Sequence, residues 1–290
     1  MNNPPTDNIG MQGKVCLVTG ATSGIGKVTA TALAAQGAEV VILGRNPQKV
    51  KDTIQTIRSE TANETTQYLL ADLADLQEVR HAARAFKDRF ARLDVLVNNA
   101  GAYFNRRHET PYGVELTFLV NHLAPFLLTH LLLDMLQTSA PARIVNVSSG
   151  SHLHGAMDFD NLGFRRGYFG MKAYACSKLA NVLFTYELAR RLQGSGVTAN
   201  ALDPGTVVTD IWRTNFSIIG PALKWFIGRI ALSPEEGADT SIYLATSPEV
   251  EGVTGQYFAK RKAVPSSPLS YDQNTALRLW QESEKLTGLA

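Results

Sequence analysis

The sequence is short of cysteine, of charge of one sign and of apolar residues near its N-terminus. Cys16 and Cys176 are its only cysteines, too few for a disulfide framework or a cysteine metal site. A formal net charge of +2 at pH 7 lacks the basic bias of a nucleic-acid-binding protein. Residues 1–12 contain no apolar run and predict a flexible tail rather than a signal peptide or anchor. We expect a soluble, cytoplasmic protein without a nucleic-acid partner.

One stretch, Thr117–Leu136, is apolar and long enough to cross a bilayer. It includes Asn121, Pro125 and Asp134 together with two histidines, and such polar groups are costly in hydrocarbon. The stretch therefore predicts a buried core helix and no membrane span.

Apolar, β-branched runs alternate with helical patterns along most of the chain. The runs predict seven strands: Val15–Thr19, Glu39–Leu43, Gln67–Ala71, Leu93–Asn98, Arg143–Val147, Thr198–Leu202 and Gly255–Ala259. The helical patterns are Ile25–Gln36, Pro47–Ala62, Leu76–Phe90, Gly113–Leu136, Ala173–Leu192, Pro234–Thr246 and Tyr271–Leu286. Such alternation predicts right-handed crossovers and a parallel sheet. We expect one domain over residues 13–290, with a Rossmann-type doubly wound α/β fold. Its sheet is expected to be mostly parallel and seven-stranded, with helices on both faces.

Two long connections interrupt this alternation, and long connections in a compact domain are usually functional. Residues 150–172 are rich in glycine and aromatic side chains, and residues 207–232 include an apolar, aromatic part. Both leave the edge of the sheet where the carboxyl ends of parallel strands bind ligands. We expect 207–232 to form a lid over an apolar substrate. An interfacial membrane helix is the less favoured alternative, because the chain shows no second anchoring signal.

The first predicted strand runs into a glycine-rich turn, TGATSGIG at residues 19–26, and then into a helix. The glycines permit a tight turn that brings the backbone close to a pyrophosphate at the helix N-terminus. A turn without a ligand is the alternative. The position between a strand and a helix favours a dinucleotide site.

Six motifs in the same order resemble those of the short-chain dehydrogenase/reductase family. After the glycine turn come NNAG at residues 98–101, Asn121, Ser149, the Tyr174/Lys178 pair and Pro204-Gly205. Thr209 follows at the family's spacing for binding the nicotinamide carboxamide. Stretches such as VNHLAPFLLT and AYACSKLANVLF resemble the retinol-dehydrogenase-like branch. The resemblance extends over nearly the whole chain.

The resemblance implies two sets of site residues. The catalytic set is Asn121, Ser149, Tyr174 and Lys178. The cofactor-binding set is Gly20, Thr22, Ser23, Gly24, Ile25, Gly26, Arg45, Asn46, Asp72, Leu73, Asn98, Ala100, Gly101, Tyr174, Lys178, Pro204, Gly205, Val207 and Thr209. No metal is expected, because no carboxylate or cysteine clearly completes the His152/His154 pair.

The spacing of Tyr174 and Lys178 places both side chains on one face of a helix. A free tyrosine has a pKa of about 10, too high for an efficient base at neutral pH. A nearby ammonium favours the phenolate, so Lys178 is predicted to lower the pKa of Tyr174. Ser149 would donate to the same substrate oxygen. It is preferred to Ser148 by the family pattern and because neighbours on a strand point to opposite faces. Asn121 would complete a proton relay to Lys178 through water. A surface Tyr-x-x-x-Lys pair and a capping serine are the alternatives.

Arg45 follows the second predicted strand, where NAD enzymes usually carry an acidic residue. Its guanidinium could pair with a 2′-phosphate, which predicts NADP(H) as the cofactor. An exposed arginine without a role is the alternative. Asp72 and Leu73 match the family's adenine-contacting pair, and Asp72 could also cap the following helix.

These features predict hydride transfer between nicotinamide and a hydrophobic aldehyde, a ketone or the matching alcohol, retinoid-like compounds included. We expect the carbonyl-reducing direction, because cellular NADPH is kept largely reduced. Two alternatives remain open: a catalytically weak NADP-binding regulator and a light-dependent protochlorophyllide-type reductase. The resemblance also implies a homodimer or homotetramer, built through the helices that carry Asn121 and Tyr174.

Overall fold

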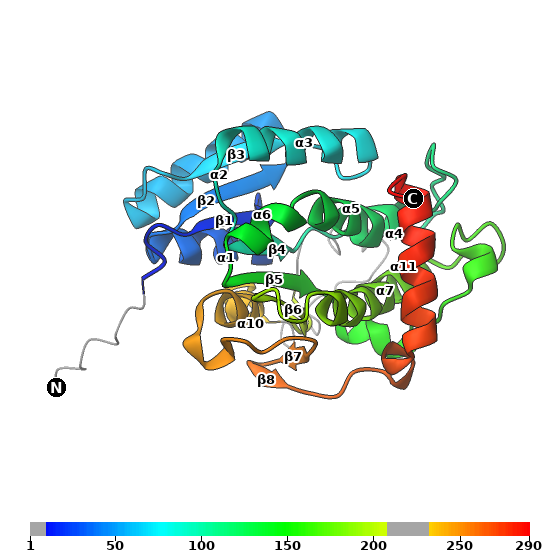
Figure 1. Ribbon diagram of the computed structural model, residues 1–290. Coiled ribbons are helices and arrows are strands. Elements are labelled where there is room, and N and C mark those ends of the chain that lie inside the picture. The colour runs from blue at the N-terminus through cyan, green and yellow to red at the C-terminus, as the bar shows by residue number, and fades with distance from the viewer. Residues whose placement is uncertain (1–9, 208–231) are drawn as a thin grey trace.

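The computed structural model describes residues 10–207 and 232–290. Within these ranges one sheet has the strand order β3-β2-β1-β4-β5-β6-β7-β8. All neighbouring strands are parallel except β7 and β8 (Figure 1). The strands are β1 (Val15–Thr19), β2 (Glu39–Gly44), β3 (Gln67–Leu70), β4 (Val95–Asn98), β5 (Ala142–Val147), β6 (Val197–Asp203), β7 (Tyr257–Ala259) and β8 (Lys262–Ala263). β2 and β3 follow on one side of β1 in the sheet, and β4 and the later strands follow on its other side. The predicted doubly wound fold is therefore confirmed.

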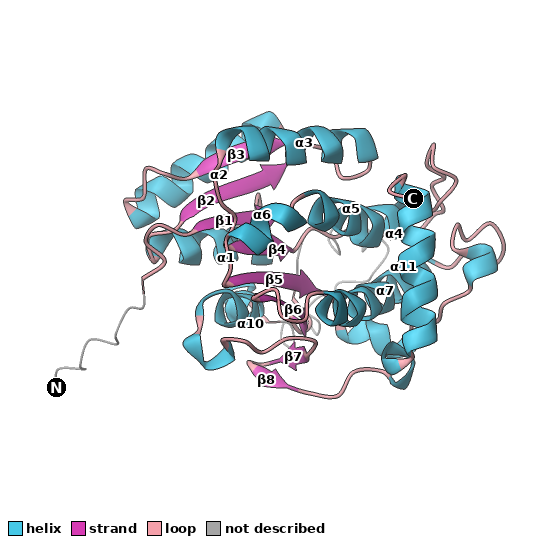
Figure 2. Ribbon diagram, in the orientation of Figure 1, coloured by secondary structure: helices cyan, strands magenta, loops and turns pink. Residues whose placement is uncertain are grey.

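Helices cover both faces of this sheet (Figure 2). The helices and single turns are α1 (Gly24–Ala35), α2 (Pro47–Thr61), α3 (Leu76–Arg89), α4 (Leu116–Phe118), η1 (Leu119–Leu123), α5 (Ala124–Leu131), α6 (Leu133–Thr138), η2 (Gly150–His154), η3 (Phe159–Asn161), α7 (Gly170–Arg191), α10 (Pro234–Thr246), η4 (Pro248–Val250), η5 (Pro268–Tyr271) and α11 (Gln273–Thr287). Leu17 packs in a core with α3, α5 and α7, whereas its neighbour Val18 packs with α1, α2 and α10. This alternation explains why the parallel strands are apolar throughout: successive side chains enter two different cores.

The sheet has one strand more than the sequence predicts. β8 pairs antiparallel with β7 after a two-residue turn, Lys260-Arg261, in which both residues have positive φ. Such a turn normally carries Asn or Gly, so this sequence gives no turn signal. Arg261 is held by an ion pair with Asp239 and by its N–H bond to Thr240 Oγ1 (3.1 Å).

The helix predicted over Gly113–Leu136 is wrong as a single element. The helical part of this segment begins with α4, where the Glu115 carboxylate accepts from the N–H groups of Thr117 and Phe118. A π-helical turn, η1, follows, and the chain breaks again between α5 and α6. Pro125 has no N–H and cannot donate to the Asn121 carbonyl, as the fourth residue along a helix normally does. The regular ladder is therefore interrupted at Asn121.

Met11, within the predicted N-terminal tail, packs against the folded domain. Of the tail predicted over residues 1–12, residues 1–9 lie outside the described residues. Met11 is buried in the core on the α1 side, and its N–H donates to the Gln36 carbonyl (2.8 Å). Its apolar side chain anchors a segment that contains no apolar run.

The C-terminal helix α11 lies beside α5 and α7 at one end of the molecule (Figure 1). Trp280 packs against Phe126 and Phe184 with ring centroids 5.2 and 5.9 Å away. The face that the resemblance assigns to subunit contacts is thus covered in part by the chain itself. The dimer or tetramer through these helices stays a prediction.

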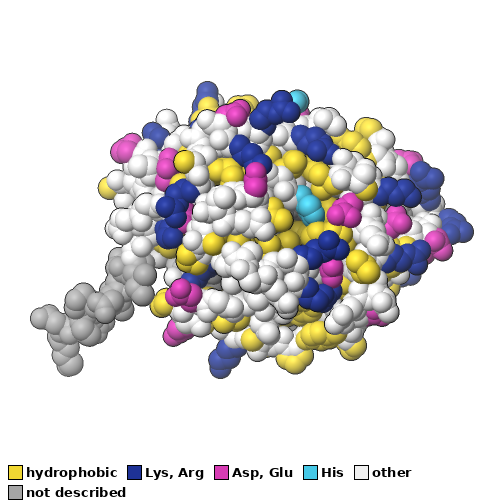
Figure 3. Space-filling model, viewed as in Figure 1, with side chains coloured by type: hydrophobic (Ala, Val, Ile, Leu, Met, Phe, Trp, Pro, Cys, Tyr) yellow, Lys and Arg dark blue, Asp and Glu magenta, His cyan; other side chains and the backbone are white. Residues whose placement is uncertain are grey.

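No described helix is both long and apolar enough to span a membrane. On the face in Figure 3, Lys and Arg side chains are interspersed with Asp and Glu. The stretch considered as a span in the sequence is instead broken into short helices whose apolar side chains enter the core.

Candidate active site

The glycine-rich turn links β1 to α1 and packs against the segment that follows β4. Gly20 has φ +66°, and a Cβ there would lie 2.8 Å from the Ala100 Cα. The Asn99 side chain donates from Nδ2 to the Thr19 carbonyl (2.9 Å) and to the Gly20 carbonyl (3.3 Å). The Thr19 hydroxyl accepts from the N–H groups of Asn99 and Ala100. The two segments are therefore fixed against each other, with glycine required where they touch.

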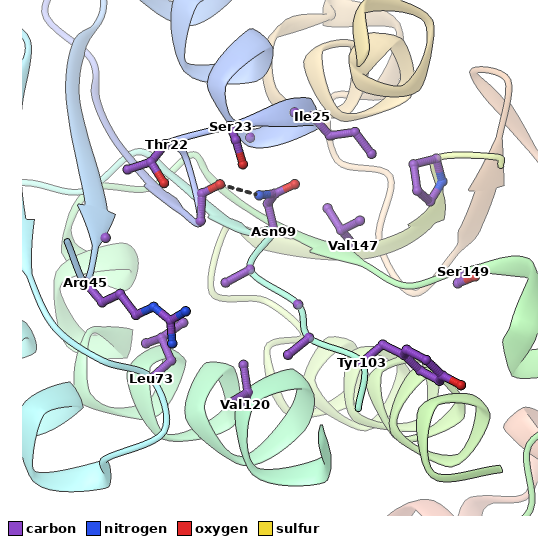
Figure 4. A pocket seen from close by; sticks show the side chains of 18 of the residues that line it. Thr22, Ser23, Ile25, Arg45, Leu73, Asn99, Tyr103, Val120, Val147 and Ser149 are labelled. Atoms are coloured by element: carbon purple, nitrogen blue, oxygen red, sulfur yellow. Dashed lines mark hydrogen bonds between the residues drawn. The ribbon is translucent and has the colours of Figure 1, made fainter. Parts of the chain in front are cut away.

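A cavity of about 960 Å³ runs along the carboxyl ends of the strands. Most predicted site residues line it: Gly20, Thr22, Ser23, Gly24, Ile25, Gly26, Arg45, Asn46, Asp72, Leu73, Ala100, Gly101, Ser149, Tyr174, Lys178, Pro204, Gly205 and Val207. Arg45 and Thr22 lie toward one end and Ser149 and Tyr103 toward the other (Figure 4). The sequence-derived set thus converges on one elongated pocket.

Asn98 departs from the prediction because it does not line this cavity. Its buried carboxamide donates to Thr129 Oγ1 (3.0 Å) and to Asn146 Oδ1 (2.8 Å) on the neighbouring strand. Asn99, one residue later, lines the cavity instead. Asn98 is still the last residue of β4, so strand alternation turns its side chain into the α5 side of the sheet.

The cavity end near β2 carries positive charge. The Arg45 side chain is 76% exposed, and its Nη1 lies 3.8 Å from Asp72 Oδ2. An exposed pair of this kind contributes only about 0–1 kcal/mol. Asn46 accepts from the Lys49 N–H (3.0 Å) and caps α2, and Lys49 also lines the cavity. Asp75, rather than Asp72, caps α3.

The opposite end brings together Ser149, Tyr174 and Lys178. Lys178 lies one turn after Tyr174 on α7, with Nζ 5.5 Å from the centroid of the phenol ring. The Lys178 ammonium donates to the Val147 carbonyl (3.0 Å). The Ser148 hydroxyl donates to the Lys178 carbonyl (2.8 Å) and so is committed to α7. Both serines line the cavity, and the choice of Ser149 as the catalytic serine stays a prediction.

The acid–base properties of this cluster differ from the sequence prediction. Burial raises the pKa of Tyr174 to about 12, opposed by the Ser149 hydroxyl and reinforced by the charge of Asp203. Burial lowers the pKa of Lys178 to about 8, and the charge of Asp203 opposes that shift. The predicted lowering of the Tyr174 pKa by Lys178 is wrong: burial outweighs the other effects, and Lys178 is not among the groups that shift this pKa. For both Tyr174 and Lys178, burial is the largest cause of the pKa shift.

Asn121 lies behind the cavity wall in η1. Its Oδ1 accepts from the Ala102 N–H (2.6 Å), and its Nδ2 donates to the Ala102 carbonyl (3.0 Å) and Ser177 Oγ (3.0 Å). The carboxamide is thus occupied in fixing the segment after NNAG. The hydrogen bonds given for this carboxamide do not reach Lys178, and the relay through water stays a prediction.

Aromatic side chains missed by the sequence analysis border the Tyr174 end. Tyr103 and Phe104 line the cavity, and the Tyr103 ring meets that of Tyr174 edge-on with centroids 6.0 Å apart. A Cβ at Gly170 would lie 2.4 Å from the Phe104 carbonyl, so only glycine lets this loop approach α7. Leu116 and Val120 also line the cavity. No local pattern marks these residues, because the loop's contact with α7 creates the wall.

The remaining predictions concern the segment after β6 and the histidine pair. Thr209 and nearly all of the predicted lid lie outside the described residues. Val207 and Leu232, which flank this part of the chain, pair in a parallel bridge beside the cavity. Of the described residues, no group of three His, Cys, Asp or Glu side chains is placed to hold a metal ion.

Comparisons with known proteins agree with this geometry. A family model described as short chain dehydrogenase matches residues 14–218. Human retinol dehydrogenase 13 is 44% identical over 286 residues, covering 96% of this chain and 85% of that protein. Human polyprenol dehydrogenase is 42% identical over 282 residues, covering 95% and 86%.

Two solved structures are also similar to this chain in fold and in sequence. An uncharacterised protein from Mycobacterium paratuberculosis has a TM-score of 0.77 and 32% identity, covering 96% of this chain and 95% of that chain. The Pseudomonas aeruginosa RhlG/NADP active-site complex has a TM-score of 0.71 and 28% identity, covering 87% and 96%.

Proposed function

This chain belongs to the short-chain dehydrogenase family, and from that premise we propose that it is an NADP(H)-dependent reductase of hydrophobic aldehydes or ketones. The observation that carries the proposal is the juxtaposition of Ser149, Tyr174 and Lys178 at one end of the elongated cavity. The fold alone would not be enough, because one fold hosts many functions.

The residues around the glycine turn fit a dinucleotide. Thr22, Ser23, Gly24 and Ile25 line the cavity at the N-terminus of α1. Ser23 is the N-cap residue, but its side chain makes no capping hydrogen bond, and the first turn has no acidic residue. These N–H groups and the helix dipole are suited to a pyrophosphate.

Arg45 supports NADP(H) as the form of the cofactor. Its guanidinium is exposed at the cavity end, and its weak pairing with Asp72 is easily exchanged for a phosphate. RhlG, a structural neighbour, is described in complex with NADP. When bound, the cofactor supplies or accepts the hydride.

The protein's own contribution is positioning and proton transfer. The Tyr174 phenol donates a proton to the carbonyl oxygen as that oxygen gains charge, and Ser149 donates a hydrogen bond to the same atom. The phenol is protonated at neutral pH, as a general acid in carbonyl reduction must be. Lys178, which lines the same cavity, holds the ribose side of the cofactor.

The walls of the cavity favour an apolar substrate. The Tyr103 ring borders the Tyr174 end, and Phe104, Leu116 and Val120 add apolar surface to the same cavity. Two relatives are named for retinol and polyprenol, which are both isoprenoid alcohols. We therefore assign long unsaturated aldehydes of this type, retinal included, as the first substrates to test.

The test is a panel of hydrophobic aldehydes and ketones, retinal included, in which consumption of NADPH and of NADH is measured. We expect turnover with NADPH, greater for long apolar aldehydes than for short ones. Arg45→Ala should reduce the preference for NADPH over NADH by roughly 10- to 100-fold, since hydrogen bonds to charged groups contribute about 1.5–3 kcal/mol. No consumption with any carbonyl would overturn the proposal, and an unchanged preference in Arg45→Ala would overturn the cofactor assignment.

A further inference from the structure

His152 lies three residues after Ser149, in η2, and its side chain is 1% exposed. Its ring is hydrogen-bonded to backbone at both nitrogens. Nδ1 lies 2.8 Å from the Ser149 carbonyl oxygen. Nε2 lies 3.1 Å from the Ser267 nitrogen, which is 115 residues away in the sequence. The ring also packs against that of Tyr257, with centroids 4.5 Å apart.

These two partners define which nitrogen of the ring carries the proton. A carbonyl oxygen only accepts, so Nδ1 must donate; a backbone N–H only donates, so Nε2 must accept. The network therefore assigns His152 as the neutral Nδ1–H tautomer. A proton on Nε2 would set two N–H groups against each other in a buried site.

The Ser149 peptide is held twice by this residue. Its carbonyl accepts from His152 Nδ1 and also from the His152 backbone N–H (3.1 Å). The Ser149 hydroxyl meanwhile accepts from the Ser151 N–H (3.1 Å). These two bonds hold the plane of the peptide group between Ser149 and Gly150. They therefore also restrict the direction in which the Ser149 side chain leaves the backbone.

The other end of the link is anchored to α7. The Tyr186 hydroxyl lies 2.7 Å from Ser266 Oγ, and Ser266 Oγ lies 2.6 Å from Ser270 Oγ. The Ser270 hydroxyl donates to the Ser267 carbonyl (2.6 Å). A continuous set of hydrogen bonds therefore runs from α7, which carries Tyr174, through Ser267 and His152 to Ser149.

We infer that His152 is a positioning residue that ties the Ser149 peptide to the C-terminal segment, and so fixes the Ser149 hydroxyl relative to Tyr174. The inference rests on the proposed function, in which Ser149 donates to the substrate oxygen. A small displacement of such a donor lowers the rate of the chemical step and leaves cofactor binding unaffected.

Three variants separate the two bonds of the ring. His152→Phe keeps a ring against Tyr257 and removes both bonds. His152→Asn keeps a donor near the Nδ1 position, and His152→Gln keeps an acceptor near the Nε2 position. His154→Phe is the matched control, because His154 is an exposed histidine in the same turn.

We expect His152→Phe to lower kcat by on the order of 10- to 100-fold, with the Kd for NADPH changed less than about twofold. His152→Asn should recover most of kcat, His152→Gln should not, and His154→Phe should match the wild type. A purely structural role would lower thermal stability in all three His152 variants without this split in kcat. Equal kcat in His152→Phe and the wild type, or equal losses in His152→Asn and His152→Phe, would overturn the inference.

Nitrogen-15 chemical shifts of the imidazole test the link without any turnover. The inference requires Nδ1 protonated and Nε2 unprotonated in the wild type, and slow exchange of the Ser267 amide that is lost in His152→Phe. A His152 ring protonated at Nε2 alone would overturn it even if the protein is active. If no carbonyl is turned over but the tautomer is as assigned, the failure lies with the proposed function.

Discussion

Asp203 is a charged side chain whose field reaches the Tyr174 end of the cavity. It lies at the end of β6, where its Oδ1 accepts from the Gly205 N–H (2.9 Å). Its Oδ2 lies 3.0 Å from where a Cβ at Gly150 would be, so it sits beside the turn after Ser149. Its negative charge adds to the effect of burial that raises the pKa of Tyr174, and it opposes the larger effect of burial that lowers the pKa of Lys178.

Asp203→Asn should therefore move the pH–rate profile to lower pH in both reaction directions. Removing the negative charge lowers the pKa of the phenol, so the phenolate needed for alcohol oxidation forms at lower pH. The protonated phenol needed for carbonyl reduction is lost at lower pH for the same reason. Initial rates over a range of pH values measure the shift. Glu60→Gln, which removes an exposed charge from α2, should leave the profile in place; a profile unmoved by Asp203→Asn would contradict this account.

At the same scale, the sequence predicts most of the site because its motifs are local. The glycine turn, Arg45, Ser149 and the Tyr174/Lys178 pair are each recognisable from spacing and neighbours. Asn98 and Asn99 are not, because which of two adjacent asparagines faces the cavity depends on where β4 ends. The predicted lowering of the Tyr174 pKa is wrong for a similar reason, since burial raises that pKa and burial is a property of the packed structure.

At the scale of elements, η1 carries a second buried histidine next to Asn121. His122 Nε2 lies 2.9 Å from Ser283 Oγ on α11, and its Nδ1 lies 3.3 Å from Asn181 Oδ1 on α7. Burial lowers the pKa of His122 to about 4. The neutral ring thus joins three helices behind the cavity wall.

This burial predicts a loss of stability in acid. The unfolded chain binds a proton at His122 below about pH 6.5, whereas the folded chain does so only near pH 4. The contribution of neutral His122 to the free energy of unfolding is therefore complete above pH 6.5. It falls by roughly 3 kcal/mol as the pH falls toward 4.

Urea unfolding of the wild type and of His122→Gln between pH 7 and about pH 4 measures this loss of stability in acid. The difference between the two free energies of unfolding should narrow as the pH falls. His81→Gln, at an exposed position of α3, is the control and should show no such change. A pH-independent difference between the wild type and His122→Gln would contradict a lowered pKa.

Elements that depend on tertiary contacts were also the ones predicted least well. The seven parallel strands follow from their apolar runs, but β8 exists because Asp239 and Thr240 hold a Lys-Arg turn. The long helix pattern in residues 113–136 is apolar enough to predict one helix. Pro125 and the anchoring of Asn121 to Ala102 instead produce a π-helical turn.

For the whole molecule, α11 closes the core on the α5 and α7 side. Trp280 is 4% exposed, lies against Phe126 and Phe184, and has the Arg191 guanidinium 4.0 Å above its ring. Its Nε1 donates to Glu284 (2.8 Å). One side chain thus accounts for much of the docking of the C-terminal helix.

Trp280→Ala should lower the free energy of unfolding by about 3–5 kcal/mol, because it removes a large buried side chain and leaves a cavity. Chemical denaturation measures the change. Leu277→Ala, at a 41% exposed position of the same helix, should cost less than about 0.5 kcal/mol. Equal effects of the two substitutions would show that α11 is not docked through Trp280.

The central claim is that the Tyr174 phenol delivers the proton in carbonyl reduction. The most direct measurement compares Tyr174→Phe with the wild type for NADPH binding, thermal stability and kcat on the best aldehyde of the panel. The account predicts a folded variant that binds NADPH normally and loses about 100- to 10,000-fold in kcat. A variant that turns over the aldehyde at a rate near that of the wild type would contradict it.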